Sequence, residues 1–283
     1  MERTYAGCLF DIDGTLTVRG DEFIPVYMHE ILANMCLSVP MAVCSARRLS
    51  HAYEKMAVIF TKSDSPQVCQ ENWVLICENG SIGYIYNTPK GKYEEFYRVP
   101  YPYDDAHRKN LFNSLNNVLE GKLSSSFLNE VGMVFRPANL DDPDREALAA
   151  RSHELAAIAT GQLSKSDPKG CLKIGDSAIG INIFPYQGNK EYGTLQFAKY
   201  LRDTKGINVE ADAKELVVVG DQPQPLGNDE TFLNGKYGTP FTVGMTHPDN
   251  IEPLPVYDLV NGRVLTGPEG TKYLLNNLKF RTL

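Results

Sequence analysis

The sequence predicts an α/β fold in which a parallel sheet is interrupted by an inserted α+β region. Apolar runs alternate with helical periodicity over residues 8–77 and again from 189 onward, which is typical of strand–helix–strand units with right-handed crossovers. The stretch between them changes pattern and predicts an antiparallel sheet with helices on one face. We therefore expect a core formed by residues 1–83 and 188–283, and an insert formed by residues 84–187.

The first apolar run ends in Asp11-Ile12-Asp13-Gly14. Such a run predicts a buried strand of a parallel sheet, and ligands of these sheets bind beyond the carboxyl ends of the strands. If the strand persists, both aspartates lie on the same face, and a hard cation such as Mg²⁺ relieves their repulsion. Gly14 lets the chain turn sharply and admits a ligand close to the backbone. The same short sequence also occurs where aspartates form turns or cap helices, but the preceding apolar run favours a functional site.

The first half of the core then continues in a regular order. Residues 23–37 carry apolar side chains at spacings of three and four, which predicts a helix, and Pro25 suits its start because no N–H is needed there. Residues 39–45 and 73–77 predict two further buried strands, with a helix over 46–59 between them.

The insert has its own strands and helices, which follow one another in two successive rounds. Strands are expected at 84–86, 93–99, 132–135, 172–174 and 179–184, and helices at 104–119 and 143–160.

The parallel pattern resumes at Asn189, and a helix is expected over 190–201. Residues 216–221 form a second apolar run that ends in an acid, Asp221, before a loop with two prolines. The remaining elements are expected to be a short helix beginning at 230, a strand at 241–244 and a helix at 271–278.

Composition excludes several classes of protein. The net charge of −7 without a long basic run argues against a nucleic-acid partner, because phosphate-backbone binding needs clustered Lys and Arg. No apolar stretch approaches the length of about 20 residues that a membrane span requires. The six cysteines are scattered without a Cys-x-x-Cys pair, and no signal peptide is visible, so we expect reduced thiols and a cytoplasmic protein. The oligomeric state, a homodimer included, stays open.

Four pieces of sequence converge only if the strands are parallel: Asp11 with Asp13, Ser45, Lys190, and Asp221 with Asp229. A phosphate monoester carries about two negative charges near neutral pH, so an attacking carboxylate needs cations beside it. Mg²⁺ held by the acids and the ammonium of Lys190 would supply them, while a hydroxyl and backbone N–H groups bind the other phosphoryl oxygens. This is the electrostatic preorganisation on which phosphoryl transfer depends.

These pieces, in this order, resemble the four motifs of the haloacid dehalogenase (HAD) superfamily, and the place of the insert resembles its type II (IIB) cap. The resemblance implies a Rossmann-like core, Asp11 as the nucleophile and Asp13 as general acid and base, with Asp13 also binding the metal through its carbonyl. It further implies that Ser45, Gly14 and Lys190 bind the phosphoryl group. The implied metal site comprises Asp11, Asp13, Asp221 and Asp229, supported by Asn228.

A finer resemblance is to phosphomannomutases and related sugar-phosphate phosphatases. The stretch from Gly220 to Phe232 is similar to the long mutase form of the last motif. The second motif departs from the mutase pattern, because Val43-Cys44-Ser45 stands where the mutases carry Gly-Gly-Ser-Asp. The insert also has a single arginine, Arg136, where the mutases have two, and a mutase must bind phosphate at both ends of a bisphosphate.

Each candidate also has a simpler interpretation. Lys190 would ordinarily be a solvated helix lysine, Ser45 a strand-end or cap serine, and Asp229 the cap of a following helix. Arg47 is expected to form a surface ion pair. The insert residues Arg136, Lys173 and Asn182 are weaker candidates for contact with substrate.

We therefore expect a Mg²⁺-dependent phosphatase that hydrolyses a small phosphorylated metabolite, a sugar phosphate above all, through an aspartyl-phosphate. The alternatives are a phosphohexose mutase of the same fold and a non-enzymatic metabolite-binding protein.

Overall fold

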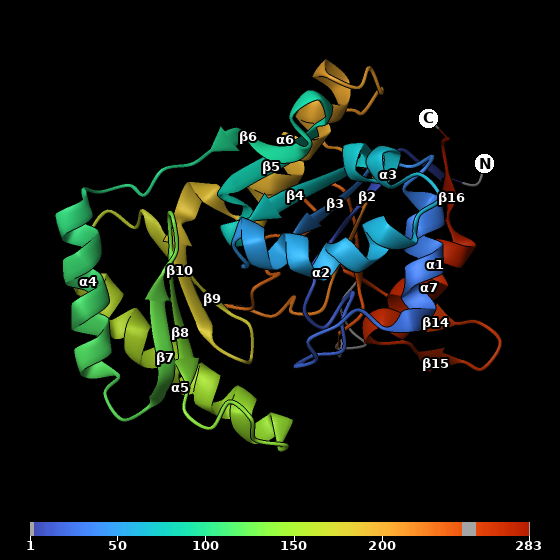
Figure 1. The fold of residues 1–283 in the computed structure, drawn as a ribbon. Coiled ribbons are helices and arrows are strands. Elements are labelled where there is room, and N and C mark those ends of the chain that lie inside the picture. The colour runs from blue at the N-terminus through green and yellow to red at the C-terminus, as the bar shows by residue number, and fades with distance from the viewer. Residues whose placement is uncertain (1–2, 245–252, 283) are drawn as a thin grey trace.

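The computed structural model describes residues 3–244 and 253–282, so residues 1–2, 245–252 and 283 of the predicted core lie outside the described part. It forms a layered core and a separate cap, which lies to the left of the core in Figure 1. The core sheet has eight strands in the order β13-β12-β11-β2-β3-β4-β5-β6. Its strands are β2 (Gly7–Phe10), β3 (Met41–Cys44), β4 (Trp73–Cys77), β5 (Ile82–Asn87), β6 (Lys92–Arg98), β11 (Leu216–Gly220), β12 (Thr239–Thr242) and β13 (Leu254–Pro255).

Helices cover both faces of this sheet because alternate strand residues are apolar on both sides. Cys8 and Phe10 of β2 pack in one hydrophobic cluster with side chains of the four helices on one face, whereas Leu9 packs in another with Phe197 of α6. The helices are α1 (Val26–Met35), α2 (Leu49–Lys62), α3 (Pro66–Asn72) and α7 (Gly267–Asn277) on the first face, and α6 (Lys190–Asp203) on the second.

The cap is a four-stranded antiparallel sheet, in the order β7-β8-β10-β9, with two helices packed on one face. Its own apolar core joins both helices to the sheet. The strands are β7 (Leu123–Leu128), β8 (Met133–Pro137), β9 (Leu172–Asp176) and β10 (Ile181–Pro185), and the helices are α4 (Asp105–Val118) and α5 (Arg145–Ser166). The predicted fold class, a parallel core with an inserted antiparallel sheet and helices on one face, is confirmed.

The remaining elements are short. Strands β1 (Thr4–Tyr5) and β16 (Lys279–Phe280) pair in parallel, and β14 (Tyr257–Asp258) and β15 (Arg263–Val264) form a hairpin. The 3₁₀ turns are η1 (Glu78–Gly80), η2 (Thr88–Lys90) and η3 (Tyr186–Gly188). The short helix expected from residue 230 is absent, because the chain there forms turns.

The predicted boundary between core and insert differs from the observed topology. We placed it at residue 84, but β5 and β6 are strands of the eight-stranded sheet, and Tyr84 pairs with Leu75 of β4. The chain reverses at η1, where Glu78 and Asn79 adopt positive φ, and so it pairs back on β4 before it leaves the core. We therefore propose that the cap comprises residues 99–187.

The expectation of six free thiols is wrong for one pair. Cys36, which follows α1, and Cys69, in α3, form a disulfide with their Cα atoms 5.0 Å apart. Their separation of 33 residues gives no sequence signal, because only the packing of the two helices brings them together. Cys8, Cys44, Cys77 and Cys171 are free. The cytoplasmic location stays a prediction, now without the argument from thiols.

Hydrogen bonds from a buried side chain and from the backbone link the cap to the core. The carboxylate of Glu78 accepts hydrogen bonds from the N–H groups of Glu130 and Val131, at 2.9 and 2.8 Å. At the end of β9, the Asp176 N–H donates to the carbonyl of Leu226, and the Asn228 N–H donates to the carbonyl of Asp176. The cap is thus bonded directly to the loop that follows β11. Across the described residues, no helix is long and apolar enough to cross a membrane.

The fit of α6 against the sheet yields a stability prediction. Phe197 is completely buried between them, and Phe197→Ala is expected to lower the free energy of unfolding by about 3–5 kcal/mol because it leaves a cavity. Urea denaturation measures this loss. Phe23→Ala serves as the control, since Phe23 is 73% exposed, and a loss at Phe197 no larger than at Phe23 would contradict the described packing.

Candidate active site

Two acids meet at the carboxyl ends of neighbouring parallel strands. Asp11 follows β2 and Asp221 follows β11, and the two strands pair directly, with Val219 opposite Phe10. The Asp11 N–H donates to the carbonyl of Val219 at 2.9 Å, which continues this pairing past the end of β2. Residues more than two hundred positions apart in the sequence therefore share one end of the sheet.

Asp229 joins them to form a buried acid cluster. Carboxylate oxygens of Asp11, Asp221 and Asp229 lie within 4.8 Å of one another, and all three residues are buried. Burial and the charge of Asp229 raise the pKa of Asp221 to about 6, while Arg19 opposes the rise. Burial likewise raises the pKa of Asp11, against the effect of the Lys190 ammonium. Concentrated negative charge of this kind needs cations nearby.

Lys190, the first residue of α6, supplies one of them. Its Nζ lies 2.6 Å from Asp11 Oδ1 and 2.6 Å from Asp229 Oδ1, and its side chain is only 1% exposed. Burial by itself lowers the pKa of Lys190, but the two carboxylates outweigh it and hold the pKa above its usual value. The side chain of Asn189 caps the helix by accepting from the Tyr192 N–H, which fixes where α6 begins. Lys190 is therefore a buried ammonium and not a solvated helix lysine.

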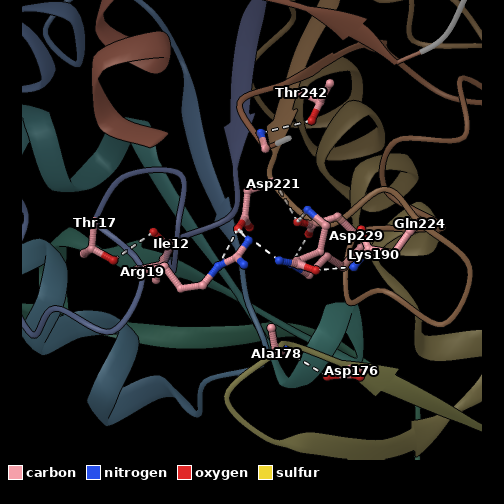
Figure 2. Close-up of polar contacts among 12 residues, drawn as sticks. Ile12, Thr17, Arg19, Asp176, Ala178, Lys190, Asp221, Gln224, Asp229 and Thr242 are labelled. Atoms are coloured by element: carbon pink, nitrogen blue, oxygen red, sulfur yellow. Dashed lines mark hydrogen bonds and ion pairs between the residues drawn. The ribbon is translucent and has the colours of Figure 1, made fainter. Parts of the chain in front are cut away.

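Asp229 holds the loop after β11 in place. Its Oδ2 accepts hydrogen bonds from the N–H groups of Asp221 and Gln222, at 2.9 and 3.0 Å, while Oδ1 binds Lys190. The sequence also allows Asp229 to cap a helix, but the residues directly after it form turns. The carboxylate instead fixes both the backbone of Asp221 and the ammonium, as Figure 2 shows.

Arg19 is a contact that sequence reasoning missed. It lies in the turn after the first motif, and its guanidinium donates to Asp221 Oδ2 through Nε, at 3.2 Å, and through Nη2 (Figure 2). A single arginine in a polar turn carries no periodicity or motif, so only the folded turn shows its target. Arg19 brings a second positive charge to the acid cluster.

Asp13 is paired with Arg47. The guanidinium forms a two-pronged contact, with Nε 2.9 Å from Oδ2 and Nη2 2.7 Å from Oδ1. We expected Arg47 to form a surface ion pair; the pair is half-buried and its partner is a motif residue. Both carboxylate oxygens of Asp13 are therefore engaged by Arg47, and of the predicted metal ligands Asp13 alone stands outside the acid cluster.

The donor set at the acid cluster fits a hard cation. Asp221 Oδ1 and Asn228 Oδ1 are both buried, and neither has a hydrogen-bond partner among the described residues. Buried oxygens without partners are costly, and an oxygen-seeking ion such as Mg²⁺ satisfies them. The carboxylates of Asp11, Asp221 and Asp229 are thus the groups that would hold the ion, and Asn228 lines the same cavity.

Gly14 and Ser45 lie at the same end of the sheet. Gly14 has φ of +82°, and a Cβ there would lie 2.2 Å from Asp221 Oδ2, so a side chain would displace the acid. Ser45 directly follows β3, is buried, and its hydroxyl accepts from the Arg47 N–H at 3.3 Å. Gly14 of the first motif thus lies beside Asp221 of the last, and Ser45 follows the strand that pairs with β2.

A cavity of about 570 Å³ opens from this site between core and cap. Asp11, Asp13 and Asp221 line it from the core, and Arg136 and Asn182 line it from the cap. Lys173, the third cap residue considered for substrate contact, points elsewhere: its Nζ lies 2.9 Å from Glu230 Oε2 of the core. That ion pair links the cap to the loop after β11.

Comparisons with known proteins place the fold. No protein-family model matches the sequence, and no curated protein matches it either. Among solved structures, the Candida albicans trehalose-6-phosphate phosphatase C-terminal domain superposes with a TM-score of 0.67 at 14% identity, covering 97% of this chain and 92% of that one.

An N-terminally truncated Plasmodium falciparum IMP-nucleotidase superposes with a TM-score of 0.59 at 15% identity, over 87% of this chain and 67% of that one. The chain shares its fold with these two proteins, and its parallel core with an inserted cap is the arrangement that the sequence resemblance implies. It spans about two thirds of the length of this truncated IMP-nucleotidase. At these identities the likeness concerns the fold, so the chemistry has to be argued from the residues of this chain.

The acid cluster predicts stabilisation by Mg²⁺. At a concentration about a hundred times the dissociation constant, the ion should add about 2.7 kcal/mol to the free energy of unfolding, because it binds the folded chain only. The gain should shrink as the pH falls through about 6, where the raised pKa of Asp221 lets its carboxyl protonate. Below that pH the Asp221 carboxyl of the folded chain is protonated, whereas in the unfolded chain the same carboxyl takes up a proton only near about pH 4. Mg²⁺ and the proton therefore compete for Asp221 in the folded chain.

Thermal unfolding with and without Mg²⁺, at about pH 5 and about pH 7.5, measures this effect. Asp221→Asn should remove most of it, whereas Asp203→Asn, at an exposed position at the end of α6, should not. An equal Mg²⁺ effect in both variants would contradict the assignment.

Proposed function

We propose that this protein is a Mg²⁺-dependent phosphatase that hydrolyses a small phosphorylated metabolite through an aspartyl-phosphate on Asp11. The observation that carries the proposal is the position of the Asp11 carboxylate. It lies at the end of β2, bonded to a buried ammonium, within the acid cluster and on the wall of the cavity. The names of the structural neighbours, a nucleotidase and a sugar-phosphate phosphatase, support the class of reaction.

In the first half-reaction, a carboxylate oxygen of Asp11 forms a bond to phosphorus while the ester P–O bond breaks. Lys190 lies beside Asp11 and offsets negative charge on the phosphoryl oxygens, and backbone N–H groups near Gly14 can donate hydrogen bonds to the other oxygens. Mg²⁺, held by the carboxylates of Asp11, Asp221 and Asp229, would supply two further positive charges to those oxygens.

Asp13 is the candidate proton donor. The departing alkoxide takes its proton, and in the second half-reaction Asp13 removes a proton from the water that attacks phosphorus. The P–O bond to Asp11 then breaks and inorganic phosphate leaves. Both Asp13 oxygens accept from Arg47, so proton transfer requires one of them to be released, and an incoming phosphate is a competing partner for the guanidinium.

Side chains of the cap form the other wall of the cavity and would contact the substrate there. Arg136 and Asn182 face the site from β8 and β10, so the group that leaves with the alkoxide meets cap side chains. Enclosing the reaction between cap and core also excludes bulk water and strengthens each charge interaction there. A sugar phosphate is the substrate class that we favour, on the sequence resemblance and the size of the cavity.

Substitution of the two motif aspartates tests the mechanism. Asp11→Asn should lower the turnover of p-nitrophenyl phosphate at least about a thousandfold, because the nucleophile is lost. Asp13→Asn should lower kcat by about 10²–10⁴, the usual contribution of a general acid–base group. Asp203→Asn, outside the cavity, is the matched control. Unchanged turnover in Asp11→Asn would remove the covalent mechanism.

A substrate panel separates the alternatives. Release of inorganic phosphate from sugar phosphates in the presence of Mg²⁺ is the expected result. Incubation with a hexose 1-phosphate and catalytic hexose bisphosphate that yields the isomer without free phosphate would identify a mutase. If no phosphate ester reacts at all, the chain is a binding protein that retains the fold.

A further inference from the structure

The edge of the cap sheet is bonded to the loop that follows β11. β9 is the outermost strand of the cap sheet, and its last residue, Asp176, forms a parallel bridge with Gly227. Two backbone hydrogen bonds make this bridge: the Asp176 N–H donates to the carbonyl of Leu226 at 2.8 Å, and the Asn228 N–H donates to the carbonyl of Asp176 at 2.9 Å. The edge strand of the cap therefore uses its free backbone groups on the core.

The middle of this loop has a conformation that needs support from outside. Leu226 has φ of +65°, in the left-handed region that residues with a Cβ seldom adopt, and such a residue persists only where its surroundings fix it. Its carbonyl accepts from the Asp176 N–H. Its N–H donates to Glu230 Oε2 at 3.3 Å, and Lys173 Nζ donates to the same oxygen at 2.9 Å. Both backbone polar groups of Leu226 are thus connected to β9, one directly and one through Glu230.

The end of β9 is itself held firmly within the cap. Asp176 is 3% exposed, and its Oδ1 accepts from the Ser152 hydroxyl at 2.6 Å and from the Ala178 N–H at 2.8 Å. Figure 2 shows the contact with Ala178. The other oxygen, Oδ2, contacts Nδ1 of His153. Asp176 therefore presents its backbone N–H and C=O to the loop from a fixed position.

The loop that β9 contacts carries acids of the cluster at both ends. Asp221 begins the loop and Asp229 follows its last turn, and Asp229 Oδ2 accepts from the N–H groups of Asp221 and Gln222. The segment bonded to β9 ends at Asn228, the residue directly before Asp229. The position of the cap edge therefore affects where the Asp229 carboxylate lies.

We propose that β9 is a latch on this loop, in which Lys173 and Asp176 are positioning residues. By fixing Leu226 in its left-handed conformation, they hold Asp221 and Asp229 at the spacing of the acid cluster. Coupling between two binding events is reciprocal, so the latch favours an ion at this spacing by the same factor by which the ion favours the latched cap. The inference rests on the proposed phosphatase function only for its Mg²⁺ measurement.

Hydrogen exchange measured by NMR without metal tests the latch first. In Lys173→Gln, the N–H groups of Asp221 and Gln222 should exchange about threefold faster than in the wild type, the usual effect of losing a partly exposed ion pair. Gly175→Val should speed this exchange further, because a Cβ at Gly175 alone would lie 3.3 Å from Asn228 Oδ1. The amides of β3, inside the core sheet, report global unfolding and should not change.

Lys122→Gln is the matched control. It removes an ion pair within the cap, between Lys122 and Glu154 at 2.6 Å, and it keeps the contacts of β9 with the core. Exchange at the two loop amides should therefore match the wild type. If Lys173→Gln and Gly175→Val behave like this control, β9 does not position the loop and the proposal is overturned.

Two rescue variants separate positioning from a general effect on the cap. Lys173→Arg keeps the positive charge and should restore the wild-type exchange rate. Leu226→Asn in the Lys173→Gln background should restore it as well, because asparagine tolerates the left-handed conformation and the loop then needs less support. A general loss of cap stability would not respond to a change at Leu226, so failure of this second rescue contradicts the proposal.

Calorimetry with MgCl₂ tests the consequence for the metal site. The dissociation constant of Mg²⁺ should rise about threefold in Lys173→Gln and stay unchanged in Lys122→Gln, and the ion should slow exchange of the Asp176 N–H in the wild type. Equal affinity in all variants overturns the proposal. If the wild type binds no Mg²⁺, the metal site of the proposed function fails, and the exchange experiment without metal decides on the latch.

Discussion

The ammonium of Lys190, held between Asp11 and Asp229, is the contact on which the rest of the site depends. Three buried carboxylates within 4.8 Å would repel strongly, and removing one partner of a buried ion pair typically costs about 3–5 kcal/mol. Because Lys190 begins α6, Asp11 directly follows β2 and Asp229 lies in the loop after β11, this one ammonium joins three separate parts of the core.

The remaining charges of the site are arranged around that contact. Arg19 approaches Asp221 from the turn after the first motif, and Arg47 engages Asp13 from the segment before α2. Each acid of the first and last motifs therefore has a cation beside it, while Asp221 Oδ1 and Asn228 Oδ1 are left without a partner among the described residues. The result is a buried cluster of acids, each of which has a cation from another part of the core beside it.

The cap is joined to this pocket by contacts that couple their geometries. Asp176 at the end of β9 exchanges backbone hydrogen bonds with the loop that carries Asn228, and Lys173 pairs with Glu230 next to Asp229. Glu78 holds the other side of the cap through two backbone N–H groups. A shift of the cap would therefore also move the loop after β11, which carries Asp221 and Asp229.

Apolar periodicity determined most of the core by itself. The strand at 73–77 and the helix beginning at Lys190 are observed at the predicted positions, because runs of buried side chains leave few alternatives. Parallel pairing then required that Asp11 and Asp221 share one end of the sheet, and they do. The tertiary structure alone decided the partners of Arg19, Arg47 and Lys173, since long polar side chains reach targets set by folding and not by local sequence. It also decided the Cys36–Cys69 disulfide and the membership of β5 and β6 in the core sheet, because each depends on which surfaces pack together after the chain has turned.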